Sequence, residues 1–174
     1  MSTELEFGSD IAMEDYTISG ATAAELRASL GRVGTVLADG RRYDGHTRHR
    51  IDWESQYWLG PGGCRLSRVV VRAEIHYVLP RWTPLSWATP GLDRRWVAYL
   101  QALKTHEERH GTIVKEAAAR LRDALDALPL RPTCAEVGQE AEHLGRRATE
   151  EMESRQRSYD GSTRHGQTEG VRLW

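Results

Sequence analysis

Residues 92–128, LDRRWVAYLQALKTHEERHGTIVKEAAARLRDALDAL, form the stretch that decides the fold. Apolar side chains recur there every three or four positions, which is the spacing of one face of an amphipathic helix. At about 1.5 Å per residue the helix would span roughly 55 Å, so we expect a bend or interruption near Gly111 and an end at Pro129. The predicted inward face consists of Leu92, Trp96, Leu100, Leu103, His106, His110, Val114, Ala117, Leu121 and Leu125.

The segments before this helix have the pattern of strands. Residues 51–57 alternate apolar and polar side chains, a turn follows at 60–63, and residues 64–79 are rich in β-branched residues up to Pro80. Residues 16–18 indicate a further short strand. These segments predict a small antiparallel sheet.

Two more helices are predicted. Thr22 and Glu25 form a capping box, which opens a helix whose inward residues are Leu26, Leu30 and Val33. A charged helix from Thr133 to about Ser154 has a thin apolar face made of Val137, Ala141, Leu144 and Ala148. The tail, residues 159–166, is rich in turn formers, and residues 1–13 are predicted to be disordered. Together these elements indicate a single α+β domain over residues 1–174.

The composition limits the partners. The 174 residues contain 24 Lys+Arg and 25 Asp+Glu, a net charge of −1, which argues against nucleic acid as a partner. No apolar run approaches the roughly 20 residues of a membrane span. The first residues lack the basic and apolar regions of a signal peptide, so we expect a cytoplasmic protein or a mature form without its leader. No motif indicates the oligomeric state.

Residues His106, Glu107 and His110 form an H-E-x-x-H motif in the middle of the long helix. Helical geometry places the two histidines about 40° apart on one face, so both imidazoles can reach one ion. Zn²⁺ suits such a site, because three protein ligands leave one position for a water whose pKa falls to about 7. Glu107 would take the proton of that water as it attacks a carbonyl, and pass it to the leaving amine.

The motif is short, and the alternative is a pair of partly buried histidines beside a solvated glutamate. The position of the histidines favours a metal, since both fall on the stripe that otherwise holds Leu, Trp and Val. Unliganded imidazoles there would be buried polar groups with no evident partner. The sheet before the helix is also what a zinc-peptidase scaffold requires.

The third ligand has candidates in two places. The charged helix offers Glu136, Glu140 and His143, in the manner of peptidases whose third ligand is a glutamate on a following helix. The tail offers Asp160 and His165. The compact metzincin pattern is excluded, because no H-x-x-G-x-x-H follows His110 in the sequence.

A series of motifs over about residues 14–170 resembles a known family. It consists of Trp53, Cys64 before the β-rich run, the segment 79–82, the motif 106–110, Cys134 and the segment 159–166, YDGSTRHG. In this order these motifs resemble a bacterial family described as predicted secreted zinc-dependent proteases, long catalogued as a domain of unknown function. Arg109 departs from the small residue expected at its position.

The resemblance implies a zincin-like α+β fold with His106 and His110 as zinc ligands and Glu107 as catalytic base. It implies His165 as third ligand, and a disulfide between Cys64 and Cys134 in exported members. A periplasmic or secreted location then becomes the better expectation, because disulfides persist in oxidising compartments.

Two neighbouring residues have suggested supporting roles. Tyr159 would donate its hydroxyl to the developing oxyanion, and Asp160 would orient a ligand imidazole. Simple packing for Tyr159 and turn formation for Asp160 are the alternatives.

The leading functional hypothesis is a zinc metallopeptidase, a hydrolase acting on a peptide or protein substrate. The rivals are a noncatalytic, metal-stabilised binding domain and a zinc amidase acting on cell-wall peptides. All three share the metal, so the motif does not separate them.

Overall fold

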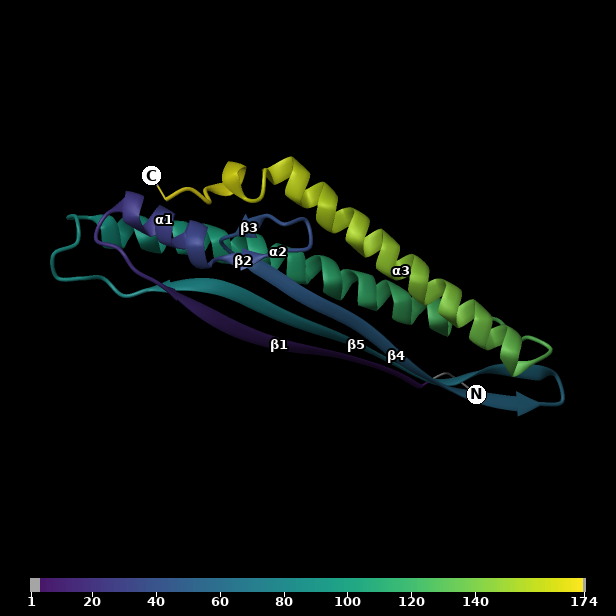
Figure 1. The fold of residues 1–174 in the computed structure, drawn as a ribbon. Coiled ribbons are helices and arrows are strands. Elements are labelled where there is room, and N and C mark those ends of the chain that lie inside the picture. Colours follow the sequence, from purple (N-terminus) through teal and green to yellow (C-terminus); the bar gives the residue numbers. More distant parts are fainter. Residues whose placement is uncertain (1–3, 174) are drawn as a thin grey trace. The chain divides into compact units, whose positions relative to one another are not determined.

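Helix α2 carries the H-E-x-x-H motif in the computed structural model, which describes residues 4–173, and runs from Leu92 to Asp126 (Figure 1). It is continuous through Gly111, so of the predicted bend or interruption the interruption is wrong and the bend stays a prediction. A Cβ at Gly111 would lie 1.9 Å from the Tyr77 hydroxyl oxygen, and this glycine therefore allows a close contact rather than a break in the helix. The predicted apolar face is confirmed, since it is buried from Leu92 to Leu125 except at the half-buried Leu100.

The described residues confirm the α+β class, while the zincin-like details stay a prediction. Strands β1, β5 and β4 form a three-stranded sheet in that order, and the short strands β2 and β3 pair antiparallel. The elements are β1 (Glu4–Ile18), α1 (Ala23–Val33), β2 (Thr35–Val36), β3 (Arg42–Tyr43), β4 (His46–Gly60), β5 (Gly63–Trp82), α2 (Leu92–Asp126), α3 (Cys134–Thr163) and the 3-10 helix η1 (Gln167–Glu169).

Strand β1 is longer than the sequence indicates. Residues 4–13 belong to it, although disorder was predicted there, and residues 1–3 of that prediction lie outside the described part. As an edge strand, β1 needs backbone hydrogen bonds to one neighbour only, and its side chains can face solvent. Ile11 and Met13 are indeed exposed, so the strand lacks the apolar alternation on which the prediction depended.

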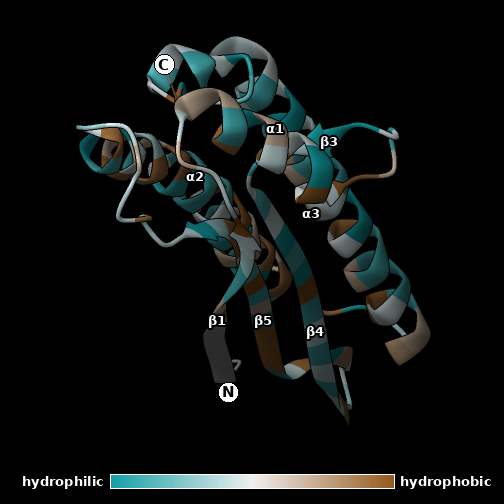
Figure 2. Cartoon of the chain, turned by 60° about the vertical axis from the view of Figure 1, so that its left-hand side comes forward, coloured by the Kyte–Doolittle hydropathy of each residue, from teal (hydrophilic) through white to brown (hydrophobic). Residues whose placement is uncertain are grey.

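Strand β5 lies between the other two strands of the sheet and is much more apolar than β4 (Figure 2). It continues through Pro80 to Trp82, so the predicted end at Pro80 is wrong. The Trp82 indole donates a hydrogen bond to the carbonyl of Gly20 and packs against Trp96 in the core. These contacts hold the last residues of the strand in place.

The chain divides into two compact units. The first contains the described part of Met1–Asp10 with His49–Ile75 and Thr112–Arg157, and the second contains Ile11–Arg48, His76–Gly111 and Ser158–Trp174. Neither is a continuous stretch of sequence, because β1, β4, β5, α2 and α3 each contribute residues to both. The H-E-x-x-H motif lies in the second unit.

The core of the second unit is built around α1 and the first part of α2. The predicted cap at Thr22 is confirmed, since its hydroxyl accepts from the Glu25 amide, while the Glu25 carboxylate accepts from the amide of Ala21, one residue before the cap. Val33 was predicted to face inward but is half exposed, because it is the last residue of the helix. The buried cluster is Ile18, Leu26, Leu30, Leu79, Trp82, Leu92, Trp96, Tyr99, Leu103 and Leu173.

The first unit contains the predicted disulfide, which is confirmed between Cys64 at the start of β5 and Cys134 at the start of α3. The two Cα atoms are 5.0 Å apart. Cys64 also exchanges two backbone hydrogen bonds with Arg131, of 2.7 and 2.8 Å, so strand and helix start are joined twice. None of the described helices has the length and apolarity to cross a bilayer.

Helix α3 ends at Thr163 rather than near Ser154, so the alternative of a turn at Asp160 is wrong, and the turn of the tail comes at residues 164–166. Its buried side chains continue at helical spacing through Met152, Gln156 and Thr163. Two of these three are polar, so the sequence shows no apolar period in this part of the helix. The extension matters for the site, because it places Tyr159 and Asp160 on a rigid helix.

The disulfide gives a first prediction, on stability. Replacing Cys64 and Cys134 together by alanine opens a link between residues 70 positions apart, and we expect the free energy of unfolding to fall by about 2–4 kcal/mol. Guanidinium denaturation, with and without a thiol reductant, measures the change. The reductant should shift the midpoint of the parent protein only, and equal midpoints for parent and variant would contradict the prediction.

Candidate metal centre

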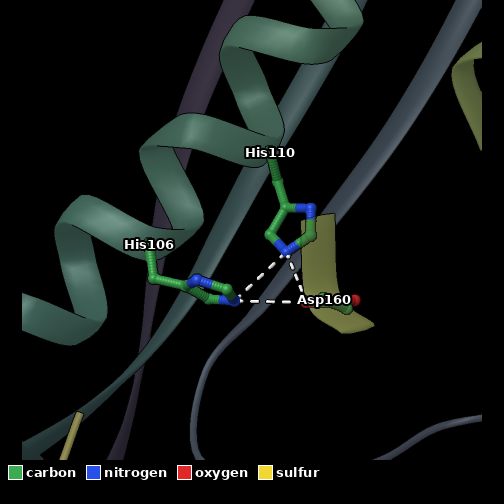
Figure 3. Close-up of side chains that lie close together, drawn as sticks. All are labelled: His106, His110 and Asp160. Atoms are coloured by element: carbon green, nitrogen blue, oxygen red, sulfur yellow. Dashed lines mark hydrogen bonds and ion pairs between the residues drawn. The ribbon is translucent and has the colours of Figure 1, made fainter. Parts of the chain in front are cut away.

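The two histidines of the motif point the same way from successive turns of α2 (Figure 3). Their Nε2 atoms are 3.3 Å apart, and only 3% of His106 and 8% of His110 is exposed. The expectation that both imidazoles share one face and meet at one point is therefore confirmed. Two imidazoles on a buried face require a polar partner.

That partner is Asp160, which reaches the histidines from the last turns of α3 (Figure 3). Its Oδ1 atom lies 3.2 Å from Nε2 of His106 and 3.0 Å from Nε2 of His110. These three residues form a group whose ligand atoms all lie within 4.8 Å of one another. The site is thus assembled from two helices that are far apart in the sequence.

The protons of this group depend on the tautomers of the two imidazoles. Nδ1 of His106 lies 2.9 Å from the Glu169 carboxylate, which assigns the proton of a neutral imidazole to Nδ1. The lone pair on Nε2 of His106 then faces Asp160 and His110. A proton on Nε2 of His110, a second proton on His106 or a metal ion can lie between these atoms.

The spacing of the donor atoms can be compared with that of a tetrahedral metal site such as zinc. Ligands bound at roughly 2.0–2.1 Å in a tetrahedral arrangement lie about 3.3–3.4 Å apart. The three distances here, 3.0 to 3.3 Å, are close to that value. Two imidazole nitrogens and one carboxylate oxygen also match the donor types of catalytic zinc sites, which have three protein ligands.

The site also shifts the pKa values of its members in opposite directions. Burial lowers the pKa of His106, but the hydrogen bonds to Asp160 and Glu169 outweigh burial and raise it overall. Burial likewise raises the pKa of Asp160, but the hydrogen bonds with His106 and His110 lower it well below its usual range. Without a metal, the hydrogen bonds with the two imidazoles therefore favour the ionised form of Asp160.

Glu169 in η1 is a site residue that the sequence did not reveal. Besides His106, its carboxylate binds the Tyr159 hydroxyl, which donates to it across 2.9–3.0 Å. A carboxylate on the outer nitrogen fixes the orientation and tautomer of a metal-binding imidazole. This role was predicted for Asp160, and the Glu169 carboxylate lies at the outer nitrogen of His106 where the role requires a partner. No local motif marks Glu169, because only the fold of the tail brings it to the site.

A left-handed turn directs the tail back over the site. Arg164 and His165 have φ values of 51° and 54°, which non-glycine residues rarely adopt, and Gly166 follows at 78°. An added Cβ on Gly166 would lie 3.1 Å from Cγ of His106 and 2.5 Å from Val171, so this glycine permits the close approach. Leu173 is buried in the core and anchors the segment that carries Glu169.

Glu107 is buried next to the histidines, with 5% of its surface exposed. The Thr47 hydroxyl lies 2.6 Å from its Oε2 atom and donates a hydrogen bond to it. Burial raises the pKa of Glu107, and the hydrogen bond from Thr47 and the two histidines offset part of this rise. Thr47 is a second residue that was missed, since nothing in the polar segment before the strand distinguishes it.

The remaining candidates are placed as follows. His165, predicted as third ligand from the resemblance, is outside the group; its Nδ1 lies 3.5 Å from Asp160, and its ring contacts Tyr43. Glu140 forms an ion pair with Arg131, Glu136 caps the start of α3, and His143 is exposed. Of the two candidates in the tail, Asp160 is the one that lies with His106 and His110 in this group.

Tyr159 packs its ring against both histidines, 4.9 Å from the His106 ring centre in a stacked arrangement. Burial and the bond to Glu169 raise the pKa of its hydroxyl. The single hydroxyl proton is donated to Glu169, so the role predicted for Tyr159, donation to an oxyanion, requires that bond to break. In the structure the Tyr159 ring stacks on His106 and its hydroxyl binds Glu169, so Tyr159 links these two residues.

Comparison with known proteins gives one match. A family model described as a bacterial protein of unknown function, DUF922, matches residues 13–166. No curated protein and no solved structure matches the chain significantly.

The ligand set yields a second prediction. Asp160→Ala removes a donor atom and should weaken Zn²⁺ binding more than about 100-fold. Losing a residue that only supports a ligand weakens binding by at most roughly 100-fold. His165→Ala should weaken it by less than that. Competition with a chromophoric chelator measures both, and the reverse order would restore His165 as the third ligand.

A third prediction concerns Glu169. Glu169→Gln keeps the shape of the side chain but removes the charge facing His106, and we expect Zn²⁺ affinity to fall about 10–100-fold. Gln167→Ala, in the same short helix and exposed, is the matched control and should leave the affinity unchanged. Equal affinities for Glu169→Gln and the parent protein would show that the carboxylate does not support the metal ligand.

Proposed function

Since the chain belongs to the DUF922 family of bacterial proteins, whose function is unknown, we propose its activity from the chemistry of the site. In this proposal the protein is a zinc-dependent metallopeptidase that hydrolyses peptide bonds, with Glu107 as the catalytic base. The observation that carries the proposal is the convergence of His106, His110 and Asp160, with a buried carboxylate on the residue after the first histidine.

The proposed zinc ligands are Nε2 of His106, Nε2 of His110 and the Asp160 carboxylate. When bound, Zn²⁺ supplies Lewis acidity, which polarises a carbonyl and lowers the pKa of water. Three protein ligands are typical of catalytic sites, whereas structural zinc sites have four. The donor count therefore supports an enzyme over a site that only stabilises the fold.

Glu107 is suited to proton transfer. Its burial raises the pKa of the carboxyl group, so the carboxylate is a stronger base than an exposed glutamate. It takes a proton from water and delivers it to the nitrogen of the leaving amine. The Thr47 hydroxyl holds the carboxylate in one orientation during both transfers.

The disulfide supports an oxidising location, so in this proposal the protein works in the periplasm or outside the cell. A peptide or protein is the proposed substrate. A zinc amidase acting on cell-wall peptides would use the same residues, and a noncatalytic metal domain would keep the ligands without needing Glu107.

The fourth prediction tests the proposal with Glu107→Gln, which keeps the size of the side chain and removes its basicity. Zinc content should stay at one per chain, while kcat on a peptide library read by mass spectrometry falls at least about 100-fold. Glu108→Gln is the matched control on the same helix, because Glu108 is 49% exposed and pairs with Lys104. It should keep the parent activity within about twofold.

Each result has a definite meaning. Full activity in Glu107→Gln would contradict the role of Glu107. Zinc binding by the parent protein with no hydrolysis of any peptide would favour the noncatalytic domain. Cleavage restricted to cell-wall peptides would favour the amidase.

A further inference from the structure

A partly buried polar cluster surrounds Asp44, in the segment between β3 and β4. Arg27 of α1 donates two hydrogen bonds to its carboxylate, and the Tyr99 hydroxyl of α2 donates a third at 2.7 Å. The Tyr16 hydroxyl of β1 donates to the backbone carbonyl of the same residue at 2.5 Å. Three different elements therefore bind one residue, through both its side chain and its main chain.

Placing these polar groups in the core carries a desolvation cost. Tyr99 is 1% exposed and the Asp44 side chain 17%, so their polar groups have lost most of their water. Well-packed apolar residues often stabilise a fold as well as a buried ion pair does. What the polar cluster adds is a fixed position for the backbone at residue 44.

The residues that follow Asp44 contact the proposed base directly. An added Cβ at Gly45 would lie 3.0 Å from Oε1 of Glu107 and 2.9 Å from Leu103, so the backbone of Gly45 packs closely against one carboxylate oxygen. The Thr47 hydroxyl lies 2.6 Å from the other oxygen and 3.1 Å from the Glu107 carbonyl. Both carboxylate oxygens are thus confined by one short segment.

We infer that Asp44 is a positioning residue for Glu107. Arg27, Tyr99 and Tyr16 hold Asp44 in place. Gly45 and Thr47 follow Asp44 in the chain and hold the Glu107 carboxylate through their contacts with it. The inference rests on the proposed function for its kinetic consequence only. The contact between segment and carboxylate exists whatever the protein catalyses. A displacement of a catalytic group by about 1 Å can lower the rate by about 100-fold.

The test separates positioning from simple stability. Asp44→Asn removes the charge that binds Arg27, and Tyr99→Phe removes one hydrogen bond only, in case the first variant does not fold. Leu30→Ala is the matched control, because it destabilises the same core but is distant in sequence from residues 44–47 and contributes no polar group. Thr47→Val and Thr47→Ser test the contact between Thr47 and the Glu107 carboxylate, since only serine keeps the hydroxyl.

The first readout needs no activity. A double-mutant cycle between Asp44→Asn, or Tyr99→Phe, and Glu107→Gln is measured by guanidinium unfolding of the full chain with EDTA present. We expect coupling of at least about threefold in the unfolding equilibrium constant, and additivity for Leu30→Ala with Glu107→Gln. Additivity for the Asp44 and Tyr99 pairs would overturn the inference.

The second readout is kinetic. Asp44→Asn and Thr47→Val should lower kcat about 10–100-fold with KM and zinc affinity within about twofold, and Thr47→Ser should recover most of the loss. Equal kcat for Asp44→Asn and Leu30→Ala, corrected for folded fraction, would also overturn the inference. If the parent protein hydrolyses no peptide, the proposed function fails, and the coupling measurement alone decides whether Asp44 positions Glu107.

Discussion

The meeting of three electron-pair donors in a buried place is the constraint on which the site depends. His106, His110 and Asp160 approach within 3.3 Å of one another, and a proton or a metal ion must lie between them to offset the repulsion of their electron pairs. The helices that carry these residues must therefore be placed accurately, since a shift of Asp160 would take its carboxylate oxygen away from two buried imidazoles.

The second unit meets this constraint from two sides. The tail reverses at Arg164 and His165, passes Gly166 over His106, and brings the Glu169 carboxylate to the outer nitrogen of that histidine. The segment before β4 brings Thr47 to Glu107. His106 and Glu107 are thus held by different parts of the chain, although they are neighbours on α2.

Burial raises the pKa of both Glu107 and Asp160, but the two carboxyl groups have different partners. A carboxylate without a cationic partner becomes more basic when it is buried, whereas one that binds two imidazoles becomes more acidic. Two carboxyl groups in one small site therefore differ in pKa in the way that a ligand and a base require. Burial acts on both, and hydrogen-bonding partners decide the outcome.

The sequence by itself determined the features that depend on local spacing. The helical period of residues 92–128 predicted α2, and the motif on it predicted that His106 and His110 would meet. The Thr22 capping box predicted α1, and the order of motifs, through a family resemblance, implied the bond between Cys64 and Cys134. Only the tertiary structure decided that α3 reaches Thr163, that Asp160 joins the two histidines, and that Thr47 and Glu169 support the site. These partners lie 50 to 63 residues away from those they bind. No periodicity records such distant contacts, because packing of the whole chain, rather than the preference of any short segment, brings the residues together.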